Sequence, residues 1–205
     1  MASGVRASSR YQCWPRLKFA VQRAHEVLLR LDPDGSMYGL FPVDMDAVGK
    51  ILGLKYVPAE FVHQIAGGEP FPDALAAHYR GHTVVILPRN GPPGRIFFDA
   101  AHEAGHQALG HFDDYDISWL RENARRTEVA RLTLAVLDRE ADTFATELLM
   151  PLAVVQSLNL SLDELQFYHC VSYTAAKRRL EDLRNPEWLE ITQDTPEALL
   201  EHCRP

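Results

Sequence analysis

Apolar residues recur every three or four positions in several stretches of the chain, a period typical of helices that bury one face. The stretch from Leu17 to Leu31 keeps this period, and a turn of aspartate, proline and glycine follows it. A second helix is predicted after Asp44, which is a good N-terminal cap, and Gly53 ends it. A third and longer helix is predicted from about Thr127 to Met150.

Shorter apolar stretches predict strands. Leu54–Val57 alternates and His82–Leu87 is rich in β-branched residues. A dense turn of proline, asparagine and glycine follows the second stretch, and Arg95–Phe98 is predicted as a further strand that pairs with it. This hairpin leads directly into a helix that contains His102. The pattern therefore predicts an α+β fold that is mostly helical, with a small antiparallel sheet or hairpin before that helix.

The C-terminal part of the chain predicts a pair of short helices. Ser161 and Glu164 form a capping-box pattern at the start of the first helix, and the second contains Lys177, Arg178 and Arg179. The pair resembles a helix-turn-helix, so DNA binding through the second helix is an alternative function. Glu181 and Asp182 flank the three basic residues on the same helix, a pattern that is more typical of a solvated helix face.

The clearest chemical signal is the segment HEAGH, in which His102 and His106 are four residues apart. On a helix, this spacing places both imidazoles on one face, where they can bind the same metal ion. Glu103 lies at the edge of that face and has the position of the general base in the H-E-x-x-H pattern of zinc peptidases. Two histidines do not make a stable zinc site, so a third protein ligand is needed.

Several residues are candidates for the third ligand. Glu140 lies on the apolar stripe of the long predicted helix, where a carboxylate is costly to bury unless it is paired or bound to metal. Glu147, two turns further on, is the alternative, and the residue pattern alone leaves both open. His111 follows Gly110, off the predicted helix, and a surface or capping role is favoured for it. A surface role is also favoured for His25.

Composition and charge narrow the functional classes. The chain has 205 residues, of which 46% are hydrophobic, so it can form a substantial core. Its net charge of −7 argues against binding nucleic acid or anionic membranes through bulk charge. Three cysteines without a C-x-x-C pair favour reduced thiols over a disulfide framework. The sequence shows no secretory signal and no apolar run long enough for a membrane span, so a cytoplasmic protein is expected.

Four segments, taken in order, resemble the ImmA/IrrE-type metallopeptidases. They are PVDMDAVGKILGL, RIFFDAAHEAGHQALGH, READTFATELLMP and HCVSYTAAKRRLEDL, and the resemblance covers about Pro42 to Leu183. The second segment contains HExxH with a trailing Gly-His, and the third matches an E-A-(N/D)-x-F-A pattern that precedes L-L-M-P. The chain has Phe-Asp where the family usually has a small polar and apolar pair before Ala-His, a difference that does not touch the histidines.

The resemblance implies a zincin-like fold with a gluzincin-like peptidase site. His102, His106 and Glu140 would bind one Zn²⁺ per chain, with Mn²⁺ as a possible substitute, and Glu103 would be the catalytic base. Asp142 matches the Asn/Asp position of the family and would have a packing or hydrogen-bonding role. The match of READTFA to the family segment also favours Glu140 over Glu147 as the third ligand.

The expected substrate is a specific protein, and the resemblance implies a transcriptional repressor, of the helix-turn-helix type, in stress-response or mobile-element systems. The oxyanion that develops during peptide hydrolysis needs a donor besides the metal. Tyr173, Tyr168 and His169 are candidates from the later helical region. Two other functions stay open: a metal-bound regulatory module that binds its partner without cutting it, and a DNA-binding protein.

These observations divide the chain into three parts. Residues 1–16 are expected to be a flexible leader, and residues 17–155 the metallopeptidase core. Residues 156–205 are expected to form a helix-turn-helix-like C-terminal helical region that packs on this core.

Overall fold

A computed structural model of the protein describes residues 14–32, 41–59, 74–79, 82–88 and 90–200. Most of the predicted leader, residues 1–13, lies outside the described residues. The elements are, in chain order, α1 (Leu17–Leu31), α2 (Met45–Leu52), β1 (Leu54–Pro58), β2 (Leu75–Tyr79), β3 (His82–Leu87), α4 (Pro93–Ala108), α5 (His111–Asp114), α6 (Ile117–Asn123), α7 (Glu128–Leu149), α8 (Leu152–Ser157), α9 (Leu162–His169), α10 (Tyr173–Asp182), α11 (Pro186–Thr192) and the 3₁₀ helix η1 (Glu197–Leu199).

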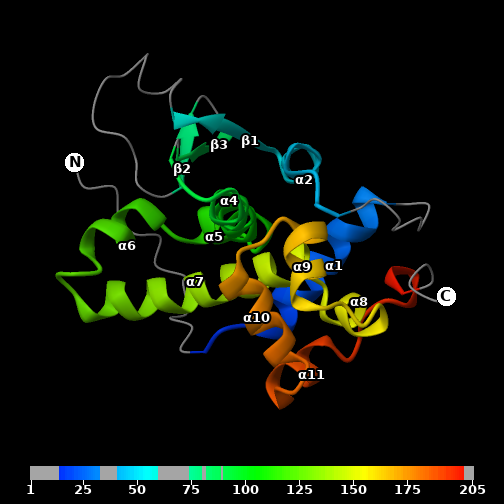
Figure 1. Cartoon of the computed structure of the whole chain (residues 1–205). Coiled ribbons are helices and arrows are strands. Elements are labelled where there is room, and N and C mark those ends of the chain that lie inside the picture. The colour runs from blue at the N-terminus through cyan, green and yellow to red at the C-terminus, as the bar shows by residue number, and fades with distance from the viewer. Residues whose placement is uncertain (1–13, 33–40, 60–73, 80–81, 89, 201–205) are drawn as a thin grey trace, which may run out of the picture.

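The long helix α7 is the centre of the fold. It packs against both α1 and α4, and the β-sheet lies on the other side of α4 (Figure 1). Phe144 and Leu148 of α7 are fully buried, and Ala101 and Ala104 of α4 belong to the same apolar cluster. Alanines at this contact let the two helix backbones approach closely. The helix that contains HEAGH therefore lies between the sheet and α7, with α7 covering one of its faces.

The helices predicted from the apolar period are confirmed. Helix α1 has the predicted bounds, Leu17–Leu31. The Asp44 side chain caps α2, and Gly53 ends that helix with a left-handed φ of 73°, which glycine adopts without steric cost. Thr127 caps α7. Local sequence determines these boundaries because each cap is made by the side chain or the backbone freedom of a single residue.

The predicted hairpin is wrong at its second strand. Arg95–Phe98 belongs to the first turns of α4. Pro93 occupies the start of the helix, where its fixed φ suits a helix and its missing N–H is not needed. The Pro92 carbonyl accepts hydrogen bonds from the N–H groups of Arg95 and Ile96, at 2.9 and 3.2 Å, and closes the first turn. The apolar run that resembled a strand is therefore a partly buried turn of a helix that starts about two turns earlier than expected.

The sheet has three strands in the order β1-β3-β2 and is mixed, not antiparallel as predicted. β1 pairs parallel with β3, with Leu54 opposite Thr83. β2 pairs antiparallel with β3, with Ala76 opposite Val85. Parallel pairing requires a crossover, so β1 and β3 are joined by a long segment rather than a tight turn.

The C-terminal helices α9 and α10 follow each other closely, as predicted, and Ser161 and Glu164 form the capping box. Lys177 and Arg178 of α10 are exposed, whereas the Arg179 side chain is fully buried. Arg179 is therefore unavailable for the DNA contact that the alternative reading assigned to all three basic residues.

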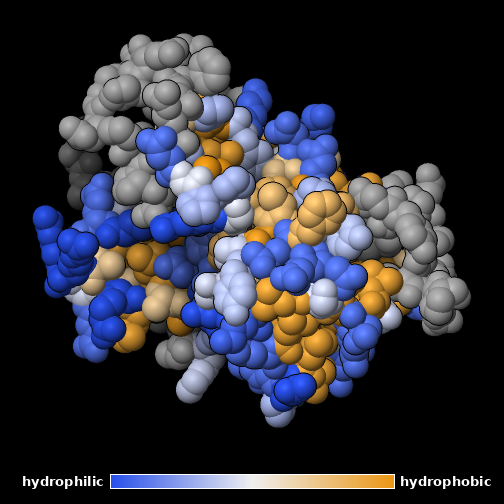
Figure 2. Space-filling view, viewed as in Figure 1, coloured by the Kyte–Doolittle hydropathy of each residue, from blue (hydrophilic) through white to orange (hydrophobic). Residues whose placement is uncertain are grey.

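The surface carries both charged and apolar side chains. Figure 2 shows apolar side chains gathered over the C-terminal helices, with hydrophilic side chains around them. Phe167 of α9 is 80% exposed. Within the described ranges, none of the helices combines the length and the apolar character needed to span a bilayer.

Candidate metal centre

Helices α4 and α7 are in close backbone contact at Gly105, the glycine of HEAGH. A Cβ atom added to Gly105 would lie 2.9 Å from the Ala141 carbonyl oxygen and 3.0 Å from the Ala141 Cα. Real Cβ atoms do not approach a backbone that closely, so only glycine permits this crossing. The close crossing brings side chains of α7 beside the two histidines of α4.

Replacing Gly105 with alanine is expected to force α4 and α7 apart. The clash is with backbone atoms, which cannot rotate away, so we expect a loss of about 1–3 kcal/mol in the free energy of unfolding, together with weaker metal binding. Chemical denaturation measures the first effect and zinc titration the second. Gly91→Ala is the control, because a Cβ there would meet only Ile96 side-chain atoms at 3.5 and 3.8 Å. Equal stability of the two variants would contradict the argument.

His102, His106 and Asp138 converge at one point. The Nε2 atoms of His102 and His106 lie 3.0 Å apart, and Asp138 Oδ1 lies 3.9 and 3.4 Å from them, respectively. A tetrahedral zinc ion with Zn–N bonds of about 2.0–2.1 Å holds neighbouring ligand atoms about 3.3 Å apart. Two imidazoles and a carboxylate are also a donor set that zinc prefers. In both spacing and chemistry, these three side chains fit a zinc ion with one coordination position left open.

Asp142 orients the first histidine. His102 Nδ1 donates to Asp142 Oδ1 at 2.8 Å, so its Nε2 is the nitrogen directed at the convergence point. This is the hydrogen-bonding role predicted for Asp142. Asp138 lies one helical turn before Asp142 and shares its face of α7. Glu140 is two residues, about 200°, around the helix from Asp138 and points elsewhere.

The structure does not bring Glu140, the predicted third ligand, to the convergence point. Its carboxylate is fully buried and accepts hydrogen bonds from the Arg16 backbone N–H at 2.7 Å and the Arg16 guanidinium at 2.8 to 3.2 Å. Glu140 Oε2 also lies 3.1 Å from His111 Nε2. Burial alone would raise the pKa of Glu140, but the hydrogen bonds from His111 and Arg16 lower it to about 2. The expectation that a buried Glu140 needs a partner is confirmed, and its partners are Arg16 and His111.

Two residues predicted to be peripheral lie close to the centre: Arg16 is half-buried and His111 is fully buried. Arg16 was placed in the flexible leader, yet its side chain forms the ion pair with Glu140. His111 was predicted as a surface or capping residue, yet it is fully buried, with its Nδ1 2.9 Å from His106 Nδ1. The signal that was available for His111 is its spacing of five residues from His106, just beyond the turn at Gly110.

Glu103 lies next to the convergence point and is buried. Arg121 of α6 donates to Glu103 Oε1 at 2.7 Å. The other oxygen, Oε2, is buried and has no hydrogen-bond partner among the described residues. Burial raises the pKa of Glu103, although the charges of Arg121 and His102 oppose that shift. An unpaired buried carboxylate oxygen is costly unless a water molecule or ligand satisfies it, so the geometry fits a residue that works on a bound molecule.

The two histidines differ electrostatically. Burial lowers the pKa of His106 to about 3, so its imidazole is neutral and can offer a lone pair. Burial also lowers the pKa of His102, but the hydrogen bond and charge of Asp142 outweigh it and raise that pKa. Neutral imidazole is the form that binds metal.

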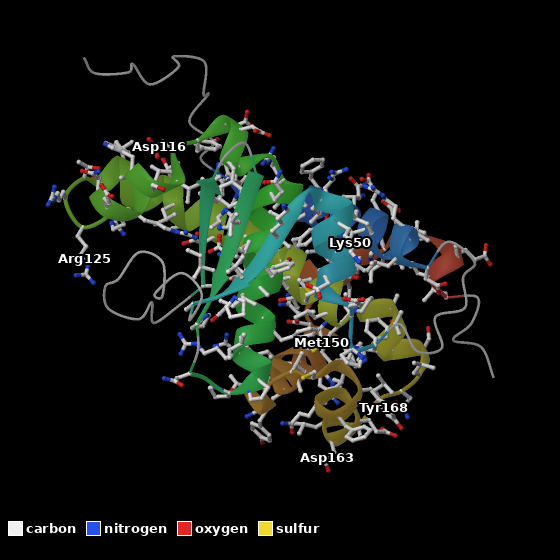
Figure 3. All side chains as sticks on the ribbon, turned by 90° about the horizontal axis from the view of Figure 1, so that it is seen from above. Lys50, Asp116, Arg125, Met150, Asp163 and Tyr168 are labelled. Carbon is white, nitrogen blue, oxygen red and sulfur yellow. The ribbon has the colours of Figure 1, made fainter. Side chains whose placement is uncertain are left out.

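The candidate oxyanion donors lie away from this centre. His169 Nδ1 donates to the Leu149 carbonyl at 2.7 Å. Leu149 is eleven residues after Asp138 on α7, so it lies about 16 Å further along the helix axis. Tyr173 follows Ser172, and the Ser172 backbone packs on Gly94 at the start of α4. Gly94 is about two helical turns before His102, so Tyr173 lies near the far end of that helix. In Figure 3, Tyr168 lies on α9, on the opposite side of the molecule from Asp116, which caps α6, the helix that contains Arg121. The structure brings none of the three to the histidines.

Glu147, the alternative third ligand, belongs to a separate buried cluster. It accepts from Arg179 and lies 2.8 Å from His25 Nε2, and all three side chains are buried. The surface role predicted for His25 is therefore wrong. Among the described residues, the group of three that could hold a metal ion is His102, His106 and Asp138.

A known protein family matches the part of the chain that contains this centre. The family model described as IrrE N-terminal-like domain, Peptidase_M78, matches residues 68–181, which is more than half of the chain. The match includes all of α4 and α7. No curated protein and no solved structure matches the chain.

Proposed function

Because the chain belongs to the IrrE N-terminal-like family of M78 peptidases, we propose that it is a zinc-dependent endopeptidase with His102, His106 and Asp138 as its metal ligands. The observation that carries the proposal is the convergence of these three side chains at spacings of 3.0 to 3.9 Å, next to a buried glutamate. Asp138 takes the place that the sequence assigned to Glu140.

A zinc ion at this point would supply a Lewis acid that polarises the scissile carbonyl and makes water more acidic. The chain's own residues do the rest. Arg121 holds Oε1 of Glu103, which leaves Oε2 to accept a proton from the attacking water and then deliver it to the leaving amine. Burial raises the pKa of Glu103 and so makes it a stronger base than an exposed carboxylate.

The substrate class that we propose is a specific protein, and a transcriptional repressor is the one that the family resemblance implies. The exposed apolar side chains of the C-terminal helices supply area for contact with a protein partner (Figure 2). A partner-binding module without activity would not need a buried base, so Glu103 and its orphaned oxygen favour hydrolysis over binding alone.

Replacing Asp138 with alanine is expected to remove the metal. The variant would hold zinc with two protein ligands instead of three. Loss of a residue that only supports a ligand lowers metal affinity about 10–100-fold, so loss of a ligand should lower it further. The measurement is zinc per chain after dialysis, followed by competition with a chelating dye. Asp163→Ala is the matched control, since Asp163 is an exposed aspartate on α9 (Figure 3). A variant at Asp138 that retains one zinc per chain at wild-type affinity would refute this ligand assignment.

A further inference from the structure

A line of buried polar groups leads away from the proposed metal centre, on the side of His106 that faces the interior. His106 Nδ1 lies 2.9 Å from His111 Nδ1, and His111 Nε2 lies 3.1 Å from Glu140 Oε2. All three side chains are fully buried. Glu140 then meets Arg16, which ends the line near the surface. The line connects a proposed ligand to an ion pair through a single imidazole.

Arg16 and Glu140 pair at the far end of this line. Arg16 donates to both oxygens of Glu140 from its guanidinium and also from its backbone N–H. His111 Nε2 lies within hydrogen-bond distance of the same carboxylate. A histidine that binds metal through Nε2 has a lone pair on that nitrogen, so the single proton of a ligating His106 is on Nδ1. The His111 Nδ1 atom 2.9 Å away is then its acceptor.

The direction of each hydrogen bond then follows from the groups involved. His111 Nε2 lies 3.1 Å from Glu140 Oε2 and 3.4 Å from Arg16 Nη2, and that guanidinium nitrogen already donates to the same carboxylate oxygen at 2.8 Å. A carboxylate only accepts, so in the shorter contact His111 Nε2 carries a proton and donates it to Glu140. A neutral imidazole has one proton, so His111 Nδ1 is bare and accepts from the Nδ1–H of His106. His106 is neutral in turn, so its Nε2 carries a lone pair, and Nε2 is the atom directed at His102 and Asp138.

We propose that His111 and Glu140, held by Arg16, are positioning residues that fix the tautomer and ring orientation of His106 for metal binding. The inference rests on the proposed metal centre. It assigns a role to His111 and Glu140, which the sequence analysis considered as candidate metal ligands. Partners of this kind commonly orient ligating histidines and tune their basicity.

The first test reads the tautomers directly in the wild-type protein. Zinc-loaded protein with ¹⁵N-labelled histidine is expected to show a proton on His106 Nδ1 and on His111 Nε2, and a bare Nδ1 on His111. Long-range ¹H–¹⁵N spectra distinguish these nitrogens. A proton on His111 Nδ1 would mean that His111 donates to His106, the opposite of the proposed direction, and would overturn the proposal. It would not bear on whether the protein binds zinc.

The second test uses two substitutions at His111. His111→Leu removes the acceptor, leaves the Nδ1–H of His106 buried without a partner, and is expected to weaken zinc binding by about 10–100-fold. His111→Asn places an amide oxygen near the position of Nδ1 and is expected to restore affinity close to that of the wild type. His169→Leu is the matched control, because it also removes a buried histidine, but one bonded to the Leu149 carbonyl.

The outcomes separate the two proposals. Wild-type zinc affinity in a folded His111→Leu protein would overturn the positioning role and leave the metal centre intact. Absence of zinc binding by the wild-type protein would overturn both. If His111→Leu does not fold, the tautomers of the wild-type protein and the affinity of His111→Asn decide the question.

Discussion

Replacing Glu103 with glutamine is expected to abolish proteolysis and leave zinc binding unchanged. Glutamine has the same shape and can keep the contact with Arg121, but its amide cannot take a proton from water. Removal of a general base typically costs about 10²–10⁴-fold in rate. We expect the variant to retain one zinc per chain and to hold its substrate uncut, so that the substrate co-purifies with it.

The measurement is a comparison of cells that express the two proteins. New protein N-termini, identified by mass spectrometry, are expected with the wild type and not with Glu103→Gln, and the protein retained by the variant should be the one that is cut by the wild type. Glu122→Gln is the control, because Glu122 is an exposed glutamate on the helix that contains Arg121. Equal cleavage by the wild type and Glu103→Gln would exclude the proposed role of this base.

The largest loss of stability is expected from Arg179→Met. Arg179 donates to Glu147 and to the Met150 carbonyl, and its guanidinium lies 4.5 Å from the centre of the Trp188 ring. Among the residues that the structure describes, methionine leaves the buried Glu147 carboxylate with His25 and the Leu152 backbone N–H as its partners. Breaking a buried ion pair by removing one partner costs about 3–5 kcal/mol, and equilibrium denaturation measures that loss directly.

Two further variants identify the cause. Arg178→Met alters the exposed neighbouring residue and is expected to change the free energy of unfolding by less than about 0.5 kcal/mol. The double variant Arg179→Met with Glu147→Leu removes both charges and is expected to recover much of the loss. If Arg179→Met is as stable as Arg178→Met, the buried pair contributes nothing to stability, and the argument from burial is wrong.

The strongest features of the sequence were local ones. The spacing of His102 and His106 on one helix, and the position of Glu103 beside them, follow from five consecutive residues and the helical period. The caps at Asp44 and Ser161 and the bounds of α1 were correct for the same reason. Each of these features is determined by residues within one or two turns of each other, so no tertiary information is needed to predict it.

The start of α4 shows where local pattern fails. Ile96, Phe97 and Phe98 have strand propensity, but they follow two prolines that start a helix, and the buried contacts of that helix decide the outcome. The parallel pairing of β1 with β3 could not be predicted from the local pattern either. The two strands are far apart in the sequence, and no tight turn between them indicates that they pair.

The third member of the proposed site depended on how two helices cross. Periodicity and the family resemblance pointed to Glu140, and Glu140 is indeed buried, but it faces Arg16 and His111. The close approach at Gly105 places the other face of α7, with Asp138 and Asp142, against the histidines. The four-residue spacing of those two aspartates was a signal in the sequence, and their orientation was not.

By itself, then, the sequence determined the helix that carries His102 and His106, the base beside them and the family to which the chain belongs. The tertiary structure alone decided the partners: Asp138 beside His106, Arg121 on Glu103, Arg16 on Glu140 and His111 behind His106. The physical reason is that a motif records which side chains share one face of one helix. The partner of a buried charge is set by the packing of separate helices, and local periodicity carries no record of that packing.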